Sequence, residues 1–428
     1  MMDRWSWMVP RFCAYGFLKN FRFFDAFLIL FLRQKGLSFL EIGTLIGVRE
    51  LTVVVLEIPT GLVADMFGRR RAMICSFGCY IVSFVGYWWG GSFLWLLPAV
   101  ALFGVGDALR SGTHKAMILE YLDVRGLSGQ SVAVYGRTRS WSQVGSGVCA
   151  LLGAALVFWR GEYAIVFLAS IVPYLLGMAL VGTYPRELDG RACGGLSLAE
   201  MLRFAGRSFE GCLRTAPLRG VLINSALDKG IYKVAKDYLQ PILESVAGML
   251  LPLVVVLSPQ AGERQATAVA VGAAYFAIHL GSAAASRRAA GVQRRLGGPK
   301  RALNRTYAAL VLVCVLAFVA LKLDLRYLAV LAFVLFAAVE NTRRPMLVSY
   351  VGAFADRDQR ATVLSVEAQM HALVAMGLGP LMGWWADRVG IAGVFVVAIA
   401  LFCVLGIPLR IREEAHNADG GPARRVGG

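Results

Sequence analysis

The sequence has few of the residues that build metal and cofactor sites. Only four histidines and eight cysteines occur among 428 residues. Cys75 and Cys79 are four residues apart on one predicted helix face, but no further thiol or histidine pair completes a metal site. Most other cysteines lie in apolar segments, where small buried hydrophobes are the expected role. We therefore expect neither a metal nor a cofactor.

Motifs for nucleotide-driven and catalytic chemistry are also missing. No G-x-x-x-x-G-K-[ST] occurs, so ATP is not expected to drive this protein. The glycine-rich run GVGDAL (Gly104–Leu109) lies inside an apolar segment and favours close helix packing there. No plausible Ser–His–Asp or zinc set appears, and an enzyme is not expected. The opening residues lack the ordered regions of a signal peptide, so no cleaved signal is expected.

Charged residues are scarce, and acids are the scarcer sign. They make up 17% of the chain, with 44 Lys and Arg against 27 Asp and Glu, which gives a net charge of +17. In a soluble protein this surplus would suggest nucleic-acid binding. Here the cations cluster between apolar segments, as the positive-inside rule of membrane proteins requires. A nucleic-acid partner is therefore not expected.

Hydrophobic residues, by contrast, are abundant throughout the chain. They form 57% of it, against about 45–50% in soluble domains, and the mean hydropathy is +0.62. The excess recurs in segments of about 20 residues, which is typical of a polytopic, all-α membrane protein. The twelve predicted spans are Pro10–Leu32, Phe39–Ala64, Ala72–Trp89, Phe93–Ile118, Val132–Phe158, Tyr163–Thr183, Pro217–Leu243, Thr267–Ser286, Ala302–Leu321, Tyr327–Tyr350, Ala361–Trp385 and Ile391–Ile411.

The run Met249–Leu257 is the main ambiguity in this count. It is strongly apolar but too short to span, and Pro252 interrupts it. The loop 287–301 carries six cations and no acid, and a thirteenth span would place that loop outside. Twelve spans place it on the cytoplasmic side together with both termini. We therefore expect Met249–Leu257 to be an outer loop or a re-entrant piece.

A polar, basic stretch divides the chain into two groups of six spans that echo each other. Asp25 in the first span corresponds to Asp228 in the seventh. Asp107 precedes Arg110 by three residues, as Glu340 precedes Arg343, and this spacing places an acid and a base on one helix face. The echo suggests a duplicated six-helix unit, as secondary transporters often have. The expected parts are two pseudo-symmetric six-helix bundles at residues 1–184 and 217–411. A cytoplasmic linker at residues 185–216 is expected between them, and a flexible tail at residues 412–428.

The turn GLVADMFGRR, at residues 61–70, lies between two apolar runs and so at a membrane face. Gly61 is expected to let two backbones approach, and Gly68 to permit a tight bend. Asp65 can accept hydrogen bonds from a helix N-terminus or pair with a cation. The cations at Arg69–Arg71 hold the turn on the cytoplasmic side. On its own, such a loop would only set topology.

These residues match G-x-x-x-D-x-x-G-R-R, and through them the chain resembles the major facilitator superfamily from about Phe23 to Leu409. Met66 departs from that family, which often has Arg or Lys directly after the aspartate. The second copy of the motif is degenerate, because Gly281 and Arg287 remain without an aspartate between them. The resemblance therefore implies an asymmetric gate.

The resemblance also implies a mechanism. Two six-helix bundles would rock around a central site lined by the first, fourth, seventh and tenth spans. The loop motif would latch the halves at the cytoplasmic side, with Asp65 near Arg360 and with Arg69 or Arg70 holding neighbouring acids. The implied gating residues are Gly61, Asp65, Gly68, Arg69, Arg70 and Arg360.

Charges at membrane depth are the candidate site residues, because such charges usually face a cavity or a partner. The candidates for binding an anionic or zwitterionic solute are Arg22, Arg110, Lys229, Lys233 and Arg343. The candidates for carrying a proton are Asp25, Asp107, Asp228, Glu340, Glu367 and His371. Asp25 leads because it is expected mid-helix in the first span. In the alternative interpretation, these acids and bases neutralise one another as structural pairs.

We therefore expect a monomeric secondary transporter in the inner or plasma membrane. It would move a small solute, anionic or amphipathic, together with protons. Two alternatives stay open at this point. The protein could be a facilitator or exchanger without a proton step, or a non-transporting sensor or assembly subunit on a transporter scaffold.

Overall fold

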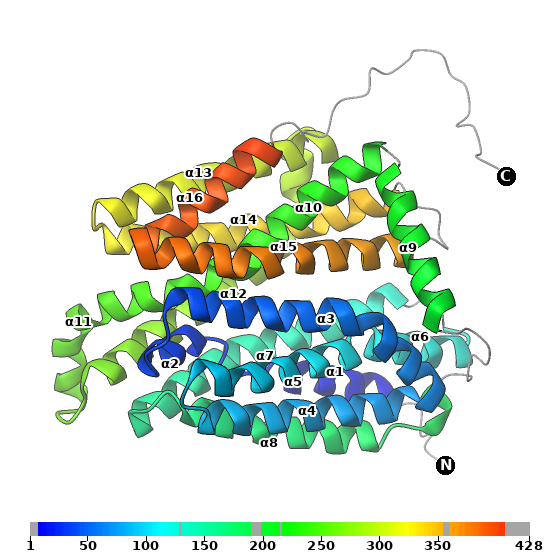
Figure 1. Cartoon of the computed structure of the whole chain (residues 1–428), viewed down its shortest axis with the longest axis horizontal. Coiled ribbons are helices and arrows are strands. Elements are labelled where there is room, and N and C mark those ends of the chain that lie inside the picture. The colour runs from blue at the N-terminus through cyan, green and yellow to red at the C-terminus, as the bar shows by residue number, and fades with distance from the viewer. Residues whose placement is uncertain (1–6, 128–130, 190–197, 215, 354–359, 407–428) are drawn as a thin grey trace.

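The computed structural model describes residues 7–127, 131–189, 198–214, 216–353 and 360–406, and within these ranges all regular structure is helical (Figure 1). The first half of the chain contains α1 (Met8–Leu18), α2 (Leu28–Gln34), α3 (Phe39–Phe67), α4 (Arg69–Trp89), α5 (Phe93–Arg110), α6 (Thr113–Val124), α7 (Ser131–Arg160), α8 (Ile165–Gly182) and η2 (Arg186–Asp189). The rest contains α9 (Leu198–Arg214), α10 (Ala216–Ala235), η3 (Lys236–Tyr238), α11 (Leu239–Leu257), α12 (Glu263–Arg295), α13 (Pro299–Lys322), α14 (Arg326–Ala353), α15 (Arg360–Val389), α16 (Ala392–Leu401) and η4 (Phe402–Gly406).

The helices form two layers that lie side by side. In Figure 1 the helices α1–α8, coloured blue through cyan to blue-green, make the lower layer. The helices from α10 onward make the upper layer, from which α11 extends at the left of the view down to the level of the lower layer. The amphipathic α9 runs across one end, from the upper layer toward the lower. We call the layers the N-terminal and C-terminal halves, and the end that carries α9, Gly68 and η2 the linker end. The opposite end, with Gly36, Gly161 and Asp324, is the capped end.

Length and composition qualify seven helical segments of the described chain as membrane spans. They are Arg69–Trp89, Phe93–Val124, Arg137–Arg160, Ile165–Gly182, Leu218–Val256, Glu263–Arg295 and Pro299–Lys322. All twelve predicted spans overlap helices, which is consistent with the expected count. The limits of the predicted domains remain predictions, and the predicted tail lies outside the described residues.

The sequence suggested that the first span is one continuous helix, but the structure shows a break in it. The chain leaves helical geometry between α1 and α2, from Lys19 to Phe27. Partners from other helices satisfy the freed backbone groups. The Phe23 amide donates to Ser170 Oγ at 3.2 Å, and the Gln240 side chain binds the Asp25 carbonyl and the Ile29 amide, both at 2.8 Å. Non-helical backbone at membrane depth is tolerated only with such partners.

The expectation for Met249–Leu257 is also wrong. This run is the second half of α11, and α11 continues from α10 through the short η3. The run is therefore the end of an extended seventh span, not an outer loop or a re-entrant piece. Its side chains Leu253 and Val256 are 63% and 79% exposed, so they can face lipid, and Pro252 is accommodated inside the helix.

The fourth predicted span is divided as well. α5 ends at Arg110 and α6 begins at Thr113, with Gly112 between them at φ +75°. This positive φ suits glycine, since other residues rarely adopt it. The break turns Ser111, His114 and Lys115 toward the space between the halves, where they line a cavity.

The two halves meet most closely at the capped end, where α3 packs against α15. Gly43 and Gly379 bring the two backbones into direct contact, and a Cβ at Gly47 would lie 2.9 Å from the Met376 carbonyl oxygen. The second line of contact joins α7 to α12, where Gly272 packs on Ala154. Small residues allow this close approach of helices. The halves are therefore closed against each other at this end.

Candidate functional site

Two cavities share the residues Asn20, Arg22 and Gln143. The smaller is lined by both halves, and the larger is lined by the N-terminal half and by Lys233 of the C-terminal half. The larger has a volume of about 540 Å³ and reaches toward the linker end as far as Lys115 and Arg139. The smaller has a volume of about 280 Å³. Because the break in the first span contributes Asn20 and Arg22, it places polar side chains where the two cavities meet.

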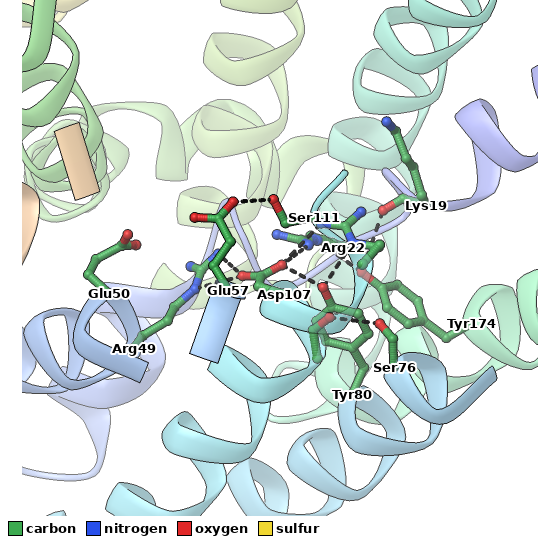
Figure 2. A network of polar contacts seen from close by, with 12 residues as sticks. Lys19, Arg22, Arg49, Glu50, Glu57, Ser76, Tyr80, Asp107, Ser111 and Tyr174 are labelled. Atoms are coloured by element: carbon green, nitrogen blue, oxygen red, sulfur yellow. Dashed lines mark hydrogen bonds and ion pairs between the residues drawn. The ribbon is translucent and has the colours of Figure 1, made fainter. Parts of the chain in front are cut away.

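Asp107 of α5 is the centre of the larger cavity's charge network (Figure 2). Its carboxylate accepts hydrogen bonds from Arg22 at 3.1 Å, Arg49 at 2.7 Å and Arg110 at 3.0 Å. The Tyr80 hydroxyl donates to the same group at 2.5 Å. Three guanidinium groups therefore share one carboxylate, which leaves this cluster with two uncompensated positive charges.

Aromatic side chains hold these arginines in place. Arg49 lies over the Phe103 ring at 4.5 Å, and Arg22 lies over the same ring at 5.1 Å. Arg22 Nε donates to the Tyr174 hydroxyl at 2.9 Å, and Arg110 Nε donates to the Tyr80 hydroxyl at 2.9 Å. Cation–π contacts and hydrogen bonds of this kind fix a guanidinium while leaving charge available to a ligand. We call Arg22, Arg49, Arg110 and Asp107 the arginine cluster.

The lining of the larger cavity carries a net positive charge. It contains seven Lys and Arg and two carboxylates, a surplus of five positive charges; these residues are Lys19, Arg22, Arg49, Arg110, Lys115, Arg139, Lys233, Glu50 and Asp107. The smaller cavity is nearly balanced, since Asp25 accompanies Arg22 and Lys236. The rest of its lining combines aromatic and aliphatic side chains, such as Phe333 and Leu239, with polar ones such as Asn341.

Two polar contacts join the halves across this site. Lys233 Nζ of α10 lies 2.5 Å from Glu50 Oε2 of α3, and the Glu50 side chain is 1% exposed. Gln240 of α11 reaches into the break of the first span and also donates to the Tyr275 hydroxyl at 3.2 Å. The C-terminal half thus contributes one cation to the cavity and one amide that stabilises the broken backbone.

The charges deeper in the C-terminal half are mostly paired with one another. Arg343 lies 2.5 Å from Asp228 and is 1% exposed, and it also donates to Asn224 and to the Leu303 carbonyl. Arg344 donates to both oxygens of Glu367, at 2.5 and 3.0 Å. Among the described residues, one buried oxygen of Glu340 has no hydrogen-bond partner.

These positions sort the predicted solute-binding residues. Arg22, Arg110 and Lys233 line the larger cavity. Lys229 lies one turn before Lys233, within electrostatic reach of Glu367 and Glu340. The guanidinium N–H groups of Arg343 already donate hydrogen bonds to other groups of the protein, so the environment of this buried residue is structural.

The predicted proton carriers lie in different surroundings. Asp25 is exposed in the break, not mid-helix as expected, and lines the smaller cavity. Asp107 and Asp228 are bound by arginines. Glu367 is engaged by Arg344, and by Ser225 at 2.6 Å. His371 has a buried Nδ1 without a partner among the described residues.

The two echoed acid–arginine pairs also differ. Asp107 and Arg110 do form the predicted i, i+3 ion pair. In the other half, Arg343 turns to Asp228 on another helix instead of pairing with Glu340. The symmetry of the sequence is therefore not repeated in the contacts.

The loop motif at the linker end is partly as expected. Gly68 has φ +98° and makes the tight bend, and Arg69 lies 3.4 Å from Glu120. The expectation for Gly61 is wrong in this conformation, because a Cβ there would meet no atom within 4 Å. The acid at the start of α4 is Asp189 of η2, which accepts from the Arg70 amide at 2.7 Å. The side chains of Asp65 and Arg360 lie outside the described set.

Sequence reasoning missed Arg49, Glu50, Tyr80, Tyr174 and Gln240 as site residues. Adjacent charges inside an apolar run signalled Arg49 and Glu50. The tyrosines and Gln240 gave no signal, because such residues are common in membrane helices. Among the residues that the structure describes, no group of three or more His, Cys, Asp or Glu is placed to hold a metal ion.

The chain is similar to known transporters. The model of the MFS_1 like family matches residues 23–409. An uncharacterized MFS-type transporter, YxaM of Bacillus subtilis (strain 168), is 28% identical over 92 residues, and this match spans 22% of the chain and only 23% of that relative's length.

Solved structures share the fold at low sequence identity. The nucleoside transporter NupG has a TM-score of 0.72 at 10% identity, with 95% of this chain and 98% of that chain covered. A POT family transporter in complex with a thioalcohol-conjugated peptide has a TM-score of 0.67 at 13% identity, with 95% and 97% covered. These matches confirm the all-α membrane fold. The chain belongs to the MFS_1 like family and is a membrane transporter of the major facilitator type.

Proposed function

We propose that this protein is a proton-coupled secondary transporter of a small organic anion that works by alternating access. The observation that carries the proposal is the arginine cluster. Three arginines converge on the single carboxylate of Asp107 inside a cavity between the halves. A cluster that only fixed helix packing would be neutralised by acids, as the ion pairs of the C-terminal half are.

The larger cavity suits the charged group of such a solute. Its surplus of cations raises the local concentration of anions. Guanidinium groups fit carboxylates and phosphates, because they can donate two parallel hydrogen bonds. The cavity's cations come from both halves, since Lys233 belongs to α10 and the arginine cluster to the N-terminal half. An anion bound between them would draw the halves together.

The smaller cavity suits an uncharged body with hydrogen-bonding groups. Tyr232, Tyr275 and Asn341 offer donors and acceptors, and Phe333 and Phe336 offer an apolar wall. Because Arg22 lines both cavities, one molecule can place its anionic group on one side of this residue and its body on the other. The named neighbours carry nucleosides and peptides, which are solutes with bodies of this kind.

The conformation supports alternating access. The halves touch at the capped end, while the larger cavity extends toward the linker end. The cation-rich loop between α12 and α13 lies at the linker end, so the positive-inside rule assigns this end to the cytoplasm. We therefore infer an inward-facing state in the inner or plasma membrane, with both termini cytoplasmic, and a monomer as the working unit. Asp65 and Arg360 remain the proposed latch of the outward-facing state.

Proton coupling needs an acid that can be neutral in one state of the cycle. Asp25, Asp107, Asp228, Glu340, Glu367 and His371 remain the candidates from the sequence. Of these, Asp25 lines a cavity, and Glu340 has a buried oxygen without a described partner. A carboxyl group in that position is stabilised by holding a proton.

Binding to the purified protein tests the proposed solute class. We expect ribose 5-phosphate, which combines a dianionic group with a hydroxylated body, to raise the unfolding temperature more than ribose or sulfate. Arg49→Gln should raise the ribose 5-phosphate concentration needed for the same stabilisation at least tenfold, since a charge-assisted contact contributes about 1.5–3 kcal/mol. The matched control is Arg33→Gln at the capped end, where Arg33 binds the nearby Leu37 carbonyl at 2.8 Å. Equal shifts in both variants, or no response to any anion, would contradict the proposed solute class.

A further inference from the structure

We propose that Glu50 couples proton uptake to solute binding. In the empty carrier the Glu50 carboxylate pairs with the Lys233 ammonium group, and Glu50 takes up a proton when the solute anion replaces it as the partner of this lysine. The inference rests on the proposed function, because it assumes an anionic solute in the larger cavity. It assigns the coupling step to a carboxylate that sequence reasoning did not select. It also gives the contact between α3 and α10 a role in transport.

The first step of the argument is the position of the pair. Glu50 and Lys233 come from different halves, and both line the larger cavity beside the arginine cluster. Arg49, the residue before Glu50, binds Asp107 directly. An anion held by the arginine cluster is therefore next to Lys233, and it competes with Glu50 for the same ammonium group.

The second step is the difference in burial between the partners. The Lys233 side chain is 31% exposed, whereas the Glu50 side chain is 1% exposed. A solute that enters the cavity can thus reach Lys233, while Glu50 has no solvent to move into. A buried carboxylate that loses its cation is costly unless it becomes neutral. Proton uptake by Glu50 removes this cost.

Charge balance gives the stoichiometry. In the empty carrier the Glu50 carboxylate neutralises the Lys233 ammonium. In the loaded carrier an oxygen of the solute takes that place, and Glu50 has gained one proton as a carboxylic acid. The lysine keeps its own proton throughout. The net charge of Glu50, Lys233 and the solute oxygen bound to Lys233 is therefore the same as that of the ion pair in the empty carrier. One proton enters for each negative charge that the solute places against Lys233.

The surroundings leave Glu50 as the acid that can respond in this way. The other carboxylate in this cavity, Asp107, is bound by three arginines, and no single cation released by a solute would free it. Glu367 on the neighbouring α15 keeps both bonds to Arg344. The charged and titratable groups that line the cavity or surround Lys233 are Lys19, Arg22, Arg49, Asp107, Arg110, His114, Lys115, Arg139, Lys229, Arg344, Glu367 and His371.

Proton uptake measured on the full-length protein in detergent tests the inference. Sulfate serves as the probe, because it is a dianion that does not titrate near neutral pH. We expect a weakly buffered solution of the protein to lose about one proton per sulfate bound. Glu50→Gln should bind sulfate with similar or higher affinity and take up none. Glu57→Gln, two turns along α3 and bonded to Ser111 at 2.7 Å, should behave like the unaltered protein.

A second measurement needs no ligand. Infrared spectra at neutral pH should show a protonated-carboxyl band when Lys233→Met removes the ammonium group that neutralises Glu50. In this background Glu50→Gln should remove the band and Glu57→Gln should retain it. Unchanged proton uptake, or an unchanged band, in a folded Glu50→Gln protein would overturn the assignment. If sulfate and ribose 5-phosphate do not bind at all, the proposed anionic solute is wrong, and the infrared band still decides whether Glu50 takes up a proton.

Discussion

Asp387, at the end of α15, caps the first turn of α3 from the opposite half of the protein. Its two carboxylate oxygens accept from the Phe39 and Leu40 amides at 2.9 and 2.7 Å. A carboxylate at a helix N-terminus satisfies free amides and interacts favourably with the helix dipole. This contact bridges the halves at the capped end, so it stabilises the conformation that is closed there.

Removing this cap should open the capped end more often. We expect Asp387→Ala to destabilise the closed arrangement by about 1 kcal/mol, which is about a fivefold change in the ratio of closed to open molecules. Distances between spin labels at Gln34 and Leu323 would report the change. Asp324→Ala is the control, because Asp324 pairs within its own half, with Arg326 at 2.8 Å. Identical distance distributions for both variants would show that the cap does not hold the halves together.

The glycines of the interface between the halves should differ sharply from the glycine of the loop motif. Gly43→Ala would drive a methyl group into the backbone at Gly379, whereas the same change at Gly61 meets open space. We expect Gly43→Ala to abolish transport or strongly favour the state open at the capped end. Gly61→Ala should fold and transport nearly normally in the same assay. The reverse order of severity would contradict the described packing.

Gln240 should matter for transport more than its uncharged side chain suggests. Its side chain binds the Asp25 carbonyl within the break and the Ile29 amide in the first turn of α2, and Leu cannot replace these hydrogen bonds. We expect Gln240→Leu to lower the unfolding temperature and to reduce transport, since each buried group left unpaired costs about 1–3 kcal/mol. Gln34→Leu, at the exposed end of α2, is the matched control. Normal transport and stability in Gln240→Leu would mean that the break is maintained by other contacts.

The Tyr80 hydroxyl should contribute to anion affinity without touching the solute. It lies between Asp107 and Arg110, so Tyr80→Phe removes one donor to the carboxylate and one acceptor for the guanidinium. We expect a loss of affinity of about three- to tenfold, or about 0.7–1.4 kcal/mol, which is the net contribution of one ordinary hydrogen bond, because the effect on the solute is indirect. Tyr87→Phe is the control, because Tyr87 is stacked on Phe167 at 4.8 Å. Isothermal titration with ribose 5-phosphate would measure both, and equal affinities in the two variants would contradict this role for Tyr80.

The sequence allowed the layout of the protein to be predicted better than its site. Apolar segment length determined the helices, and the loop motif with two groups of six spans indicated the family. The spacing of Asp107 and Arg110 correctly paired them, because i, i+3 neighbours share a helix face whatever surrounds them. Arg22 and Arg49 join the same carboxylate from other helices, and spacing along the chain does not encode that register.

The break in the first span was hidden for a physical reason. Residues 21–26 read Phe-Arg-Phe-Phe-Asp-Ala, without the glycine or proline that usually marks an interruption. The segment leaves the helix because partners far along the chain, Ser170 and Gln240, satisfy its backbone groups. Tertiary contacts of this kind override local preference. In Met249–Leu257 the misleading signal was Pro252, which is accommodated inside α11 and does not interrupt it.

Uptake of radiolabelled ribose 5-phosphate into proteoliposomes, with and without an imposed pH gradient, tests the central claim most directly. We predict accumulation above the equilibrium level only with the gradient, and its loss in Arg49→Gln but not in Arg33→Gln. Uptake that only equilibrates and ignores the gradient would point to a facilitator or exchanger. No uptake of this or any other organic anion by folded protein would contradict the account.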